Sequence, residues 1–481
     1  MEQPNSGSGR PDGADGTDEF ALIERLADAF AAAGPPAVPG DLGIGDDAAL
    51  IALPPGPAVL ATDLVVGGVH VDPDVSSPAD IGWKSLMVAV SDLAAPRPDH
   101  VPRELLTDDA AALLADPSVN VVVELMGGLE PAGTLVRTAL DAGRPVVTAN
   151  KALLASADGV ALRALARDRG VDLLYEAAVA GAIPLVRALR ESLTGERIRR
   201  VMGIVNGTTN YILTKMGEQG ADYAAVLAEA QALGLAERDP TADVEGHDAA
   251  AKAAILAGVA FGYDVAGDAV LCEGISSVTA EDVDFARRFG YVIKLLAIVE
   301  RVGEDSLSVR VHPALVPEAH PLAGVRDAFN AVFIEGEAAG ELMLYGQGAG
   351  GLPTASAVVG DVIDATRNLL AGTTAPAPDR QPAHLLDADD LVAGFCISLD
   401  VTDRPGVLAE VTAAFGAHGV SIRSMEQEAR SAGPGGADDG ARLTFVTHGA
   451  REGDVRATLA DLEGLDSLQR IGGVMRIAGT A

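Results

Sequence analysis

The stretch VNVVVELMGG, Val119 to Gly128, decides the fold of this chain. It is a continuous apolar run bounded by turn residues, which is typical of a strand buried on both faces. The pattern then repeats: a helix that ends at Gly143 leads to the strand RPVVTAN (144–150), and a helix that ends at Gly170 leads to VDLLYEA (171–177). Alternating short buried strands and helices predict β-α-β units and a parallel sheet.

Polar and glycine residues come at the end of each of these strands. The three segments are ELMGG (124–128), TANK (148–151) and YEAAVAG (175–181). Ligands of parallel sheets bind beyond the carboxyl ends of the strands. We therefore expect these three segments to line one binding site.

The composition is that of an acidic globular protein. A length of 481 residues predicts two to four domains, and a net charge of −34 argues against a nucleic-acid or anionic-membrane partner. The two cysteines, Cys272 and Cys396, cannot form a disulfide framework, and no apolar run is long enough to span a membrane. We expect a cytoplasmic protein whose residues 1–19 form a disordered polar tail.

The C-terminal region has the pattern of a second, smaller fold. The Pro/Ala/Asp-rich segment 372–390 predicts a linker, and residues 391–481 predict a β-α-β-β-α-β order, which is the ferredoxin-like plan. The opening motif DRPGVLAEVTAAF (403–415) resembles that of an ACT domain. The resemblance implies a regulatory module, with threonine as its allosteric amino acid. A dimerisation module without a ligand remains the alternative.

The middle of the chain carries an ordered set of longer motifs: TANKALLA, YEAAVAGAIP, GIVNGTTNYIL, AERDPTADVEGHDAAAKAAIL, CEGI and YGQGAGGLPTASAVVGD. With ELMGG, they make the chain from about residue 96 onward resemble homoserine dehydrogenase. The resemblance implies NAD(P)-dependent interconversion of L-homoserine and L-aspartate 4-semialdehyde, in the biosynthesis of threonine, methionine and isoleucine. It also implies a homodimer or homotetramer.

The expected fold class is α/β and α+β multidomain. The resemblance implies an incomplete Rossmann-like parallel sheet, with residues 96–150 as the remainder of the dinucleotide-binding domain. Residues 151–371 would form an α+β substrate and dimerisation domain, whose last helix returns to the nucleotide domain. The ferredoxin-like ACT domain follows.

Reducing an aldehyde requires a proton donor at the carbonyl oxygen. Asp248 and Lys252 are spaced i, i+4 on an Ala-rich helix, so both side chains extend from one face. Alone, this pair would be a solvated salt bridge; the resemblance places it, with Lys151, in the catalytic site. The resemblance also implies substrate binding by Glu237, which would hold the substrate ammonium group, and by Asp243, Asn206, Gly207 and Thr208.

The cofactor residues are predicted from the strand ends and from a glycine loop. GQGAGGLPTASA (346–357) has the G-x-G-x-x-G spacing but is followed by no β-α-β unit, so it fails as a dinucleotide fingerprint. The resemblance makes it a loop close to the cofactor. The expected cofactor-binding residues are Gly127, Thr148, Asn150, Gly348 and Gly350.

The motif YEAAVAGAIP resembles a monovalent-cation site of the same family. The matching positions imply Na⁺ ligation by Glu176, Val179, Gly181 and Ile183. Ala182 stands where relatives often carry a second glycine, and alanine tolerates fewer backbone conformations.

The N-terminal stretch DLGIGDDAAL (41–50) has G-x-G-x-x-A spacing, but its two aspartates would repel a bare pyrophosphate. Together with LATDLVVGGVHV and GWKSLMVAVSDLAA, it makes residues 20–95 resemble the N-terminal part of thiamine-monophosphate kinase. The resemblance implies that four aspartates bind Mg²⁺, which carboxylates favour: Asp46, Asp47, Asp63 and Asp92.

Joining this kinase-like segment to the dehydrogenase leaves no room for the first strand and Gly-rich turn of a dinucleotide fold. We therefore expect a chimera with an exposed edge on the neighbouring strand and weakened NAD(P) affinity. Two other readings remain open: an ATP/Mg²⁺ phosphotransferase fragment, and a non-catalytic amino-acid-binding ACT protein. The longer coverage favours the dehydrogenase.

Overall fold

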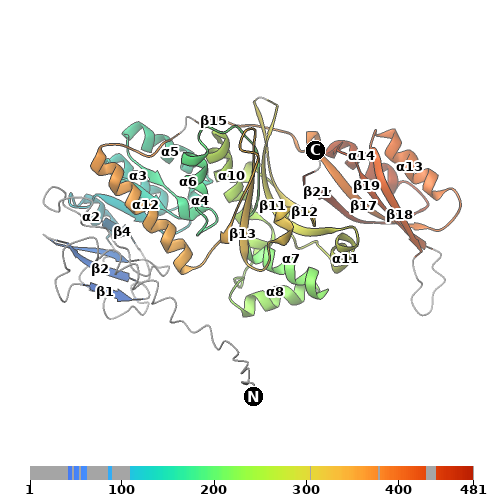
Figure 1. Ribbon diagram of the computed structural model, residues 1–481, viewed down its shortest axis with the longest axis horizontal. Coiled ribbons are helices and arrows are strands. Elements are labelled where there is room, and N and C mark those ends of the chain that lie inside the picture. The colour runs from blue at the N-terminus through green and yellow to red at the C-terminus, as the bar shows by residue number, and fades with distance from the viewer. Residues whose placement is uncertain are drawn as a thin grey trace, which may run out of the picture.

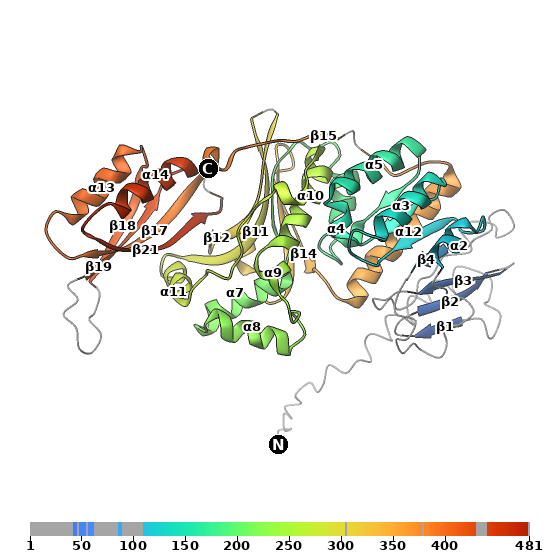
Figure 2. The same ribbon diagram turned by 180° about the vertical axis from the view of Figure 1, so that it is seen from behind.

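The structure is a computed structural model, which describes residues 42–45, 48–53, 56–61, 85–88, 109–303, 305–377, 380–429 and 440–479. Three parts follow one another along the long axis of the molecule: a parallel-sheet domain, a central antiparallel sheet with its helices, and a C-terminal sheet with two helices (Figures 1 and 2). No helix in the described ranges is both long and apolar enough to cross a bilayer.

The first part is built on four parallel strands in chain order: β4 (Ser85–Val88), β5 (Val121–Glu124), β6 (Val146–Thr148) and β7 (Leu173–Leu174). Beyond β4 lie β3 (Gly56–Ala61), β2 (Ala48–Leu53) and β1 (Leu42–Gly45). Helices α3 (Ala132–Asp141) and α5 (Ala157–Arg169) pack on one face, and α12 (Gly351–Ala371) packs on the other (Figure 1). The short helix α2 (Ala110–Ala115) precedes β5.

Both faces of the parallel strands are buried, as the apolar run predicts. Val121 and Val123 pack with Val358 of α12, whereas Val122 packs with the cluster of α3 and α5. Successive side chains of a strand point to opposite faces, so a strand between two helical layers needs apolar residues at every position. The predicted parallel sheet is confirmed, and so is the return of the last helix, α12, to it.

The outer edge of β5 is not free. β4 pairs with it in parallel, from Ser85 opposite Val121 to Val88 opposite Glu124. The prediction of an exposed strand edge is therefore wrong, because a strand from the N-terminal residues 20–95 occupies that position.

The central part is an antiparallel sheet in the order β14 (Glu341–Gln347), β13 (Phe329–Gly336), β8 (Ile198–Ile204), β11 (Tyr291–Val302) and β12 (Ser306–Pro317). The associated helices are α7 (Gly207–Gln219), α8 (Tyr223–Ala232), α9 (Thr241–Val244), α10 (His247–Phe261) and α11 (Ala280–Arg288). Alanines of α10 share the largest apolar cluster with strand residues such as Val299 and Val309. Small side chains let this helix lie close to the sheet.

The C-terminal part has the predicted ferredoxin-like order: β17 (Val392–Thr402), α13 (Val407–Ala417), β18 (Ile422–Ala429), β19 (Gly440–Thr447), α14 (Glu452–Glu463) and β21 (Leu468–Ile477). Its strands lie in the spatial order β21-β17-β19-β18. β21 also pairs in parallel with β12 through Arg476 and Ile477, so the central and C-terminal sheets are continuous.

A buried lysine holds α7 against the central sheet. Lys294 of β11 is 3% exposed, and its Nζ donates to Asn210 Oδ1 at 2.8 Å and to the Val325 carbonyl at 2.5 Å. Burial, reinforced by the nearby Arg326, lowers the pKa of Lys294 from 10.5 to about 8. An ordinary lysine loses its proton only near pH 10.4.

This difference predicts a pH dependence of stability. Between about pH 8 and pH 10.5 the unfolded chain binds more protons at this position than the folded chain, so the contribution of Lys294 to stability rises with pH. The free energy of unfolding of the wild type, minus that of Lys294→Met, should increase by on the order of 2 kcal/mol between pH 7 and pH 10. Urea unfolding at several pH values measures it. A constant difference would contradict the prediction.

Candidate active site

One carboxylate joins three of the predicted site residues. Asp248, in the first turn of α10, accepts from Lys252 Nζ at 2.7 Å through Oδ2. Its Oδ1 pairs with Lys151 Nζ, from the first residue of α4 (Lys151–Leu154) after β6. The Asp248 side chain is 4% exposed and that of Lys252 11%, whereas that of Lys151 is 48% exposed. Lys151 therefore presents the solvent-facing ammonium group of this cluster.

The amide group of Asn206 and the carboxylate of Asp243 complete the cluster. Asn206 Nδ2 donates to Asp243 Oδ1 at 2.6 Å and to Asp248 Oδ2 at 2.9 Å. Lys252 Nζ also donates to the carbonyl of Val205 at 2.7 Å. The end of β8, the N-terminus of α7 and the N-terminus of α10 thus meet at one point.

The neighbouring ammonium groups lower the pKa of the Asp248 carboxyl group. Burial works against the ionised form of Asp248, but the ammonium groups of Lys252 and Lys151 and their hydrogen bonds outweigh it and hold its pKa well below the usual range. Asp248 is therefore ionised throughout the neutral pH range. It acts as a fixed anion that orients two lysines.

The turn before α10 depends on a glycine. Gly246, the N-cap of α10, has φ of +82°, and a Cβ there would lie 2.9 Å from Cys272 Sγ. Both the backbone conformation and the close approach exclude larger residues. The N-terminal turn of α10, with Asp248, is placed by this contact.

The other residues predicted for substrate binding are spread more widely. Gly207 and Thr208 begin α7 next to Asn206, and Thr208 Oγ1 donates to the Leu235 carbonyl at 2.6 Å. Asn210, at the end of NGTTN, faces Lys294 instead of the Asp248 cluster. Glu237 has an exposed side chain on the loop before α9.

A second hydrogen-bond network joins the carboxyl ends of β5 and β6. Glu124 accepts from Thr148 Oγ1 at 2.6 Å and from the backbone amides of Met126 and Gly127 at 2.8 and 3.3 Å. Asn150 Nδ2 donates to the Gly128 carbonyl at 2.7 Å. Gly127, Thr148 and Asn150 therefore lie together, as predicted, at the edge where ligands of parallel sheets bind.

Sequence reasoning did not single out Glu124 itself, although it is 1% exposed and central to this network. The available signal was an acidic residue at the end of an otherwise apolar strand. Such a residue is buried only when its oxygens are paired.

The glycine loop of β14 and α12 packs against the loop after β7. Gly348 lies so close to Asn330 that a Cβ would stand 2.0 Å from its side chain, and a Cβ on Gly181 would stand 2.6 Å from the Gly348 carbonyl oxygen. Gly350 is the N-cap of α12. The predicted cofactor loop and the predicted cation loop are thus neighbours in the structure.

The residues predicted for sodium are buried in that loop. The Glu176 carboxylate accepts from the backbone amides of Val186 and Arg187 at 2.8 and 2.7 Å. Burial raises the pKa of Glu176, against the lowering effect of those two hydrogen bonds. Val179, Gly181 and Ile183 are all buried. Within the described ranges, no cluster of three or more His, Cys, Asp or Glu side chains is arranged to hold a metal ion.

The aspartates predicted for Mg²⁺ lie outside the described residues: Asp46, Asp47, Asp63 and Asp92.

Comparison with protein families gives three matches. Residues 69–176 match the homoserine dehydrogenase NAD-binding domain, residues 184–363 match homoserine dehydrogenase, and residues 397–466 match the ACT domain. The first match begins inside the segment that resembles the kinase.

Relatives match over most of their length. The chain is 52% identical to homoserine dehydrogenase of Corynebacterium glutamicum over 396 residues, which are 81% of this chain and 87% of the relative. It is 51% identical to that of Mycobacterium tuberculosis, over 79% of this chain and 87% of the relative. A crystal structure of a homoserine dehydrogenase from Thiobacillus denitrificans superimposes with a TM-score of 0.71 at 43% identity, covering 77% of this chain and 84% of that one. The Staphylococcus aureus enzyme at pH 7.5 gives 0.64 at 33% identity, covering 81% and 89%.

Proposed function

Because this chain belongs to the homoserine dehydrogenase family of NAD(P)-dependent oxidoreductases, we propose that the cluster around Asp248 is the catalytic centre for interconverting L-homoserine and L-aspartate 4-semialdehyde. The observation that supports this assignment is the single buried carboxylate shared by Lys151 and Lys252. It brings a lysine of the nucleotide-binding side and a lysine of the substrate side to one point.

The two lysines have different tasks in this proposal. Lys252 uses two of its three N–H bonds on Asp248 and Val205, which leaves one for the carbonyl oxygen of the substrate. Lys151, being half-exposed, faces an entering substrate and exchanges the proton with that oxygen. Asp248 keeps both ammonium groups in place. The proposed ligands of the amino acid part are Glu237, Asp243, Asn206, Gly207 and Thr208.

The nicotinamide cofactor, when bound, supplies or accepts the hydride. The residues fit such a group: Gly127 and Gly128 are exposed at the carboxyl end of β5, and a Cβ on either would meet no atom within 4 Å. We place the cofactor there, beside Thr148, Asn150 and the loop of Gly348 and Gly350. The NAD-binding family match supports this placement.

The catalytic proposal predicts a loss of turnover. Lys252→Met or Lys151→Met should lower kcat for homoserine oxidation by about 10²–10⁴, the usual contribution of a positioned proton donor or acceptor. Steady-state kinetics and circular dichroism of the same samples measure activity and folding. Lys215→Met is the matched control, because Lys215 pairs with Asp327 instead of Asp248. Unchanged kcat in a folded Lys252→Met protein would remove Lys252 from the mechanism.

We propose weak cofactor binding, because the sequence ahead of β5 has the acidic stretch 41–50 where a Gly-rich dinucleotide turn is expected. Without the amides that this turn supplies to a pyrophosphate, NADPH and NADH should bind with millimolar dissociation constants. Fluorescence titration of the purified chain measures both and also gives the preference between them. A micromolar constant for either cofactor would contradict the proposal.

The ACT domain offers a specific cavity for a regulatory amino acid. A cavity of about 330 Å³ lies between α11 and the sheet of β17, β19 and β21. Arg442 and Arg470 reach Asp400 at 2.7 and 3.1 Å, and both approach Glu281 of α11 at 3.3 Å. Cationic and anionic side chains on one cavity suit the two charges of a free amino acid. We propose threonine as the ligand.

Threonine should lower the activity of the full chain and raise its melting temperature, since a ligand of the folded state stabilises it. Arg470→Gln should weaken both effects at least tenfold in threonine concentration, and Arg456→Gln on the exposed side of α14 should not. Enzyme assays and thermal unfolding with increasing threonine measure this. No response of either quantity in the wild type would leave the ACT domain as a dimerisation module.

Further proposals rest on sequence resemblance. These are a structural Na⁺ at the Glu176 loop, a homodimer or homotetramer, and descent of residues 20–95 from a thiamine-monophosphate kinase with Mg²⁺ at its aspartates. A cytoplasmic location is proposed instead from the two cysteines, which cannot form a disulfide framework. The motifs quoted for each of the two ion sites support those two proposals.

A further inference from the structure

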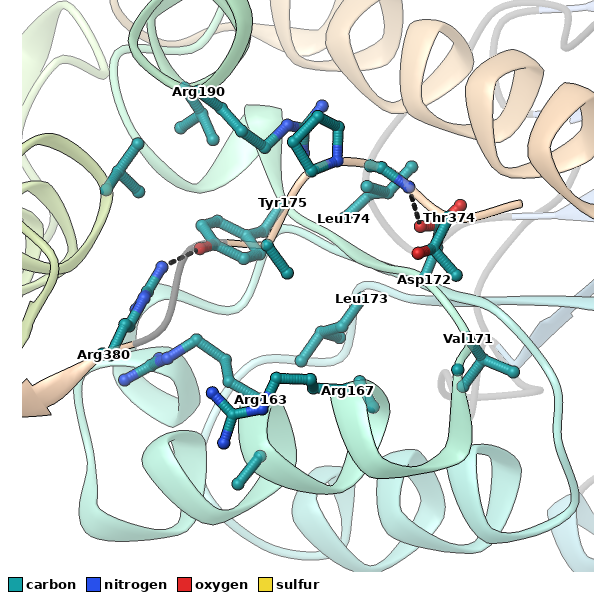
Figure 3. A pocket seen from close by; sticks show the side chains of 18 of the residues that line it. Arg163, Arg167, Val171, Asp172, Leu173, Leu174, Tyr175, Arg190, Thr374 and Arg380 are labelled. Carbon is teal, nitrogen blue, oxygen red and sulfur yellow. Dashed lines mark hydrogen bonds between the residues drawn. The ribbon is translucent and has the colours of Figure 1, made fainter. Parts of the chain in front are cut away.

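A cavity of about 390 Å³ lies at the far edge of the parallel sheet. β7 is the last strand of that sheet, and the cavity is enclosed by β7, α5 and the segment that follows α12 (Figure 3). Apart from Tyr175, the first residue of segment 175–181, none of the residues that line it belongs to the Asp248 cluster, to the strand-end segments 124–128 and 148–151 or to the ACT cavity. It therefore has no role in the proposed reaction.

The cavity is basic in a strongly acidic protein. Among the described residues, its lining has four guanidinium groups and two carboxylates, in a chain whose net charge is −34. Arg163 and Arg167 come from α5, Arg190 comes from the π-helix η4 (Ala188–Ser192), and Arg380 comes from the segment beyond α12 (Figure 3). Four cations from three separate segments of the chain thus meet at one cavity and give it a local positive field.

Carboxylates neutralise only part of this field, and one of them, Glu191, pairs with Arg190 at 2.7 Å. Asp172 accepts from the Ala375 amide and from Asn368 Nδ2, both at 2.7 Å. Asp264 is shared by Arg163 at 3.0 Å and Arg380 at 3.6 Å. One of the two lining carboxylates is thus occupied by neutral donors, and the other serves two arginines.

The arginines are buried and incompletely paired. The side chains of Arg163, Arg190 and Arg380 are 13%, 11% and 11% exposed. In the described part of the chain, the Nε atoms of Arg163 and Arg190 have no hydrogen-bond partner. Burial and the nearby Arg380 lower the pKa of Arg163, the direction expected for two cations held together. Buried charges of this kind are normally paired.

The arrangement is held in place by backbone structure. The segment after Arg380 forms β15 (Gln381–Pro382), which pairs in parallel with β9 (Tyr263–Asp264). Arg380 also donates to the Tyr175 hydroxyl at 2.7 Å (Figure 3). The cavity is therefore formed before any ligand enters, which reduces the entropy cost of binding.

We propose that this cavity binds a small organic oxyanion, whose carboxylate or phosphoryl group lies between Arg163 and Arg380. The planar fork of a guanidinium matches both groups, with two parallel N–H···O bonds. Leu173, Val186 and Val259 supply apolar contacts for the carbon part of the ligand. Because Arg380 belongs to the segment that leads to the ACT domain, the bound anion ties that segment to α5.

The test uses the full chain and two probes, inorganic phosphate and succinate, at constant ionic strength. Calorimetric titration should show one saturable site for at least one probe, and the probe that binds identifies the phosphoryl or carboxylate class. The same probe should raise the melting temperature in proportion to its occupancy. Arg380→Gln and Arg163→Gln should each weaken binding at least tenfold. Arg367→Gln on the exposed side of α12 is the matched control and should bind normally.

Three results would overturn the proposal. The first is that neither probe binds saturably to the wild type. The second is that the variants bind as well as the wild type. The third is that NADP⁺ displaces the bound probe, which would assign the probe to the proposed cofactor site at the ends of β5 and β6. Turnover of homoserine by Arg380→Gln at saturating cofactor serves as the folding check, since Arg380 lies outside the catalytic cluster.

Discussion

The buried Asp248 carboxylate is the contact on which the site depends. An isolated carboxylate at 4% exposure would be strongly disfavoured, and its burial is compensated by the ammonium groups of Lys151 and Lys252 and by a hydrogen bond from Asn206. Lys252 lies one turn away on the same helix, but Lys151 comes from the parallel-sheet domain. The same interaction that arranges the chemical groups therefore also fixes how α4 approaches α10. The arrangement of these charged groups and the packing of the two domains are therefore set by one interaction.

Much of the fold follows from local sequence pattern, because the pattern reports which faces are buried. Val121 and Val123 pack against α12, whereas Val122 packs against α3 and α5. A strand without polar positions therefore already implies a helical layer on each face. The ferredoxin-like order is readable for the same reason. The continuity of the central and C-terminal sheets cannot be predicted from the sequence, since the pairing of β21 with β12 involves backbone groups at only two positions. Backbone pairing at a sheet edge leaves no mark in the side chains.

The site residues also divide into those whose position follows from local sequence spacing and those that only the tertiary fold brings together. The i, i+4 spacing of Asp248 and Lys252 places them on one face without any knowledge of the tertiary fold. The position of Asn206 between Asp243 and Asp248 arises from packing between segments about 40 residues apart, and no spacing rule gives it. The N-terminal segment shows the limit of motif reasoning. Its motifs resemble a kinase, yet β4 within it pairs with β5, and the NAD-binding match begins at residue 69.

Arg476 lies where the C-terminal domain is attached to the central sheet. It lies in β21 where that strand pairs with β12. Its guanidinium group pairs with Glu273, which follows β10 (Leu271–Cys272), and with Glu452 of α14, at distances of 2.7–2.8 Å. The Arg476–Glu273 pair therefore adds a side-chain contact to the two-residue backbone pairing of β21 with β12, whereas the Arg476–Glu452 pair lies within the C-terminal domain. The sheet then runs from β21 through β12 and β11 to β8, which ends beside the Val205 carbonyl that holds Lys252. A displacement of β21 relative to β12 would therefore act on the same continuous sheet that leads to the Val205–Lys252 contact, and on the ion pair between Arg476 and Glu273.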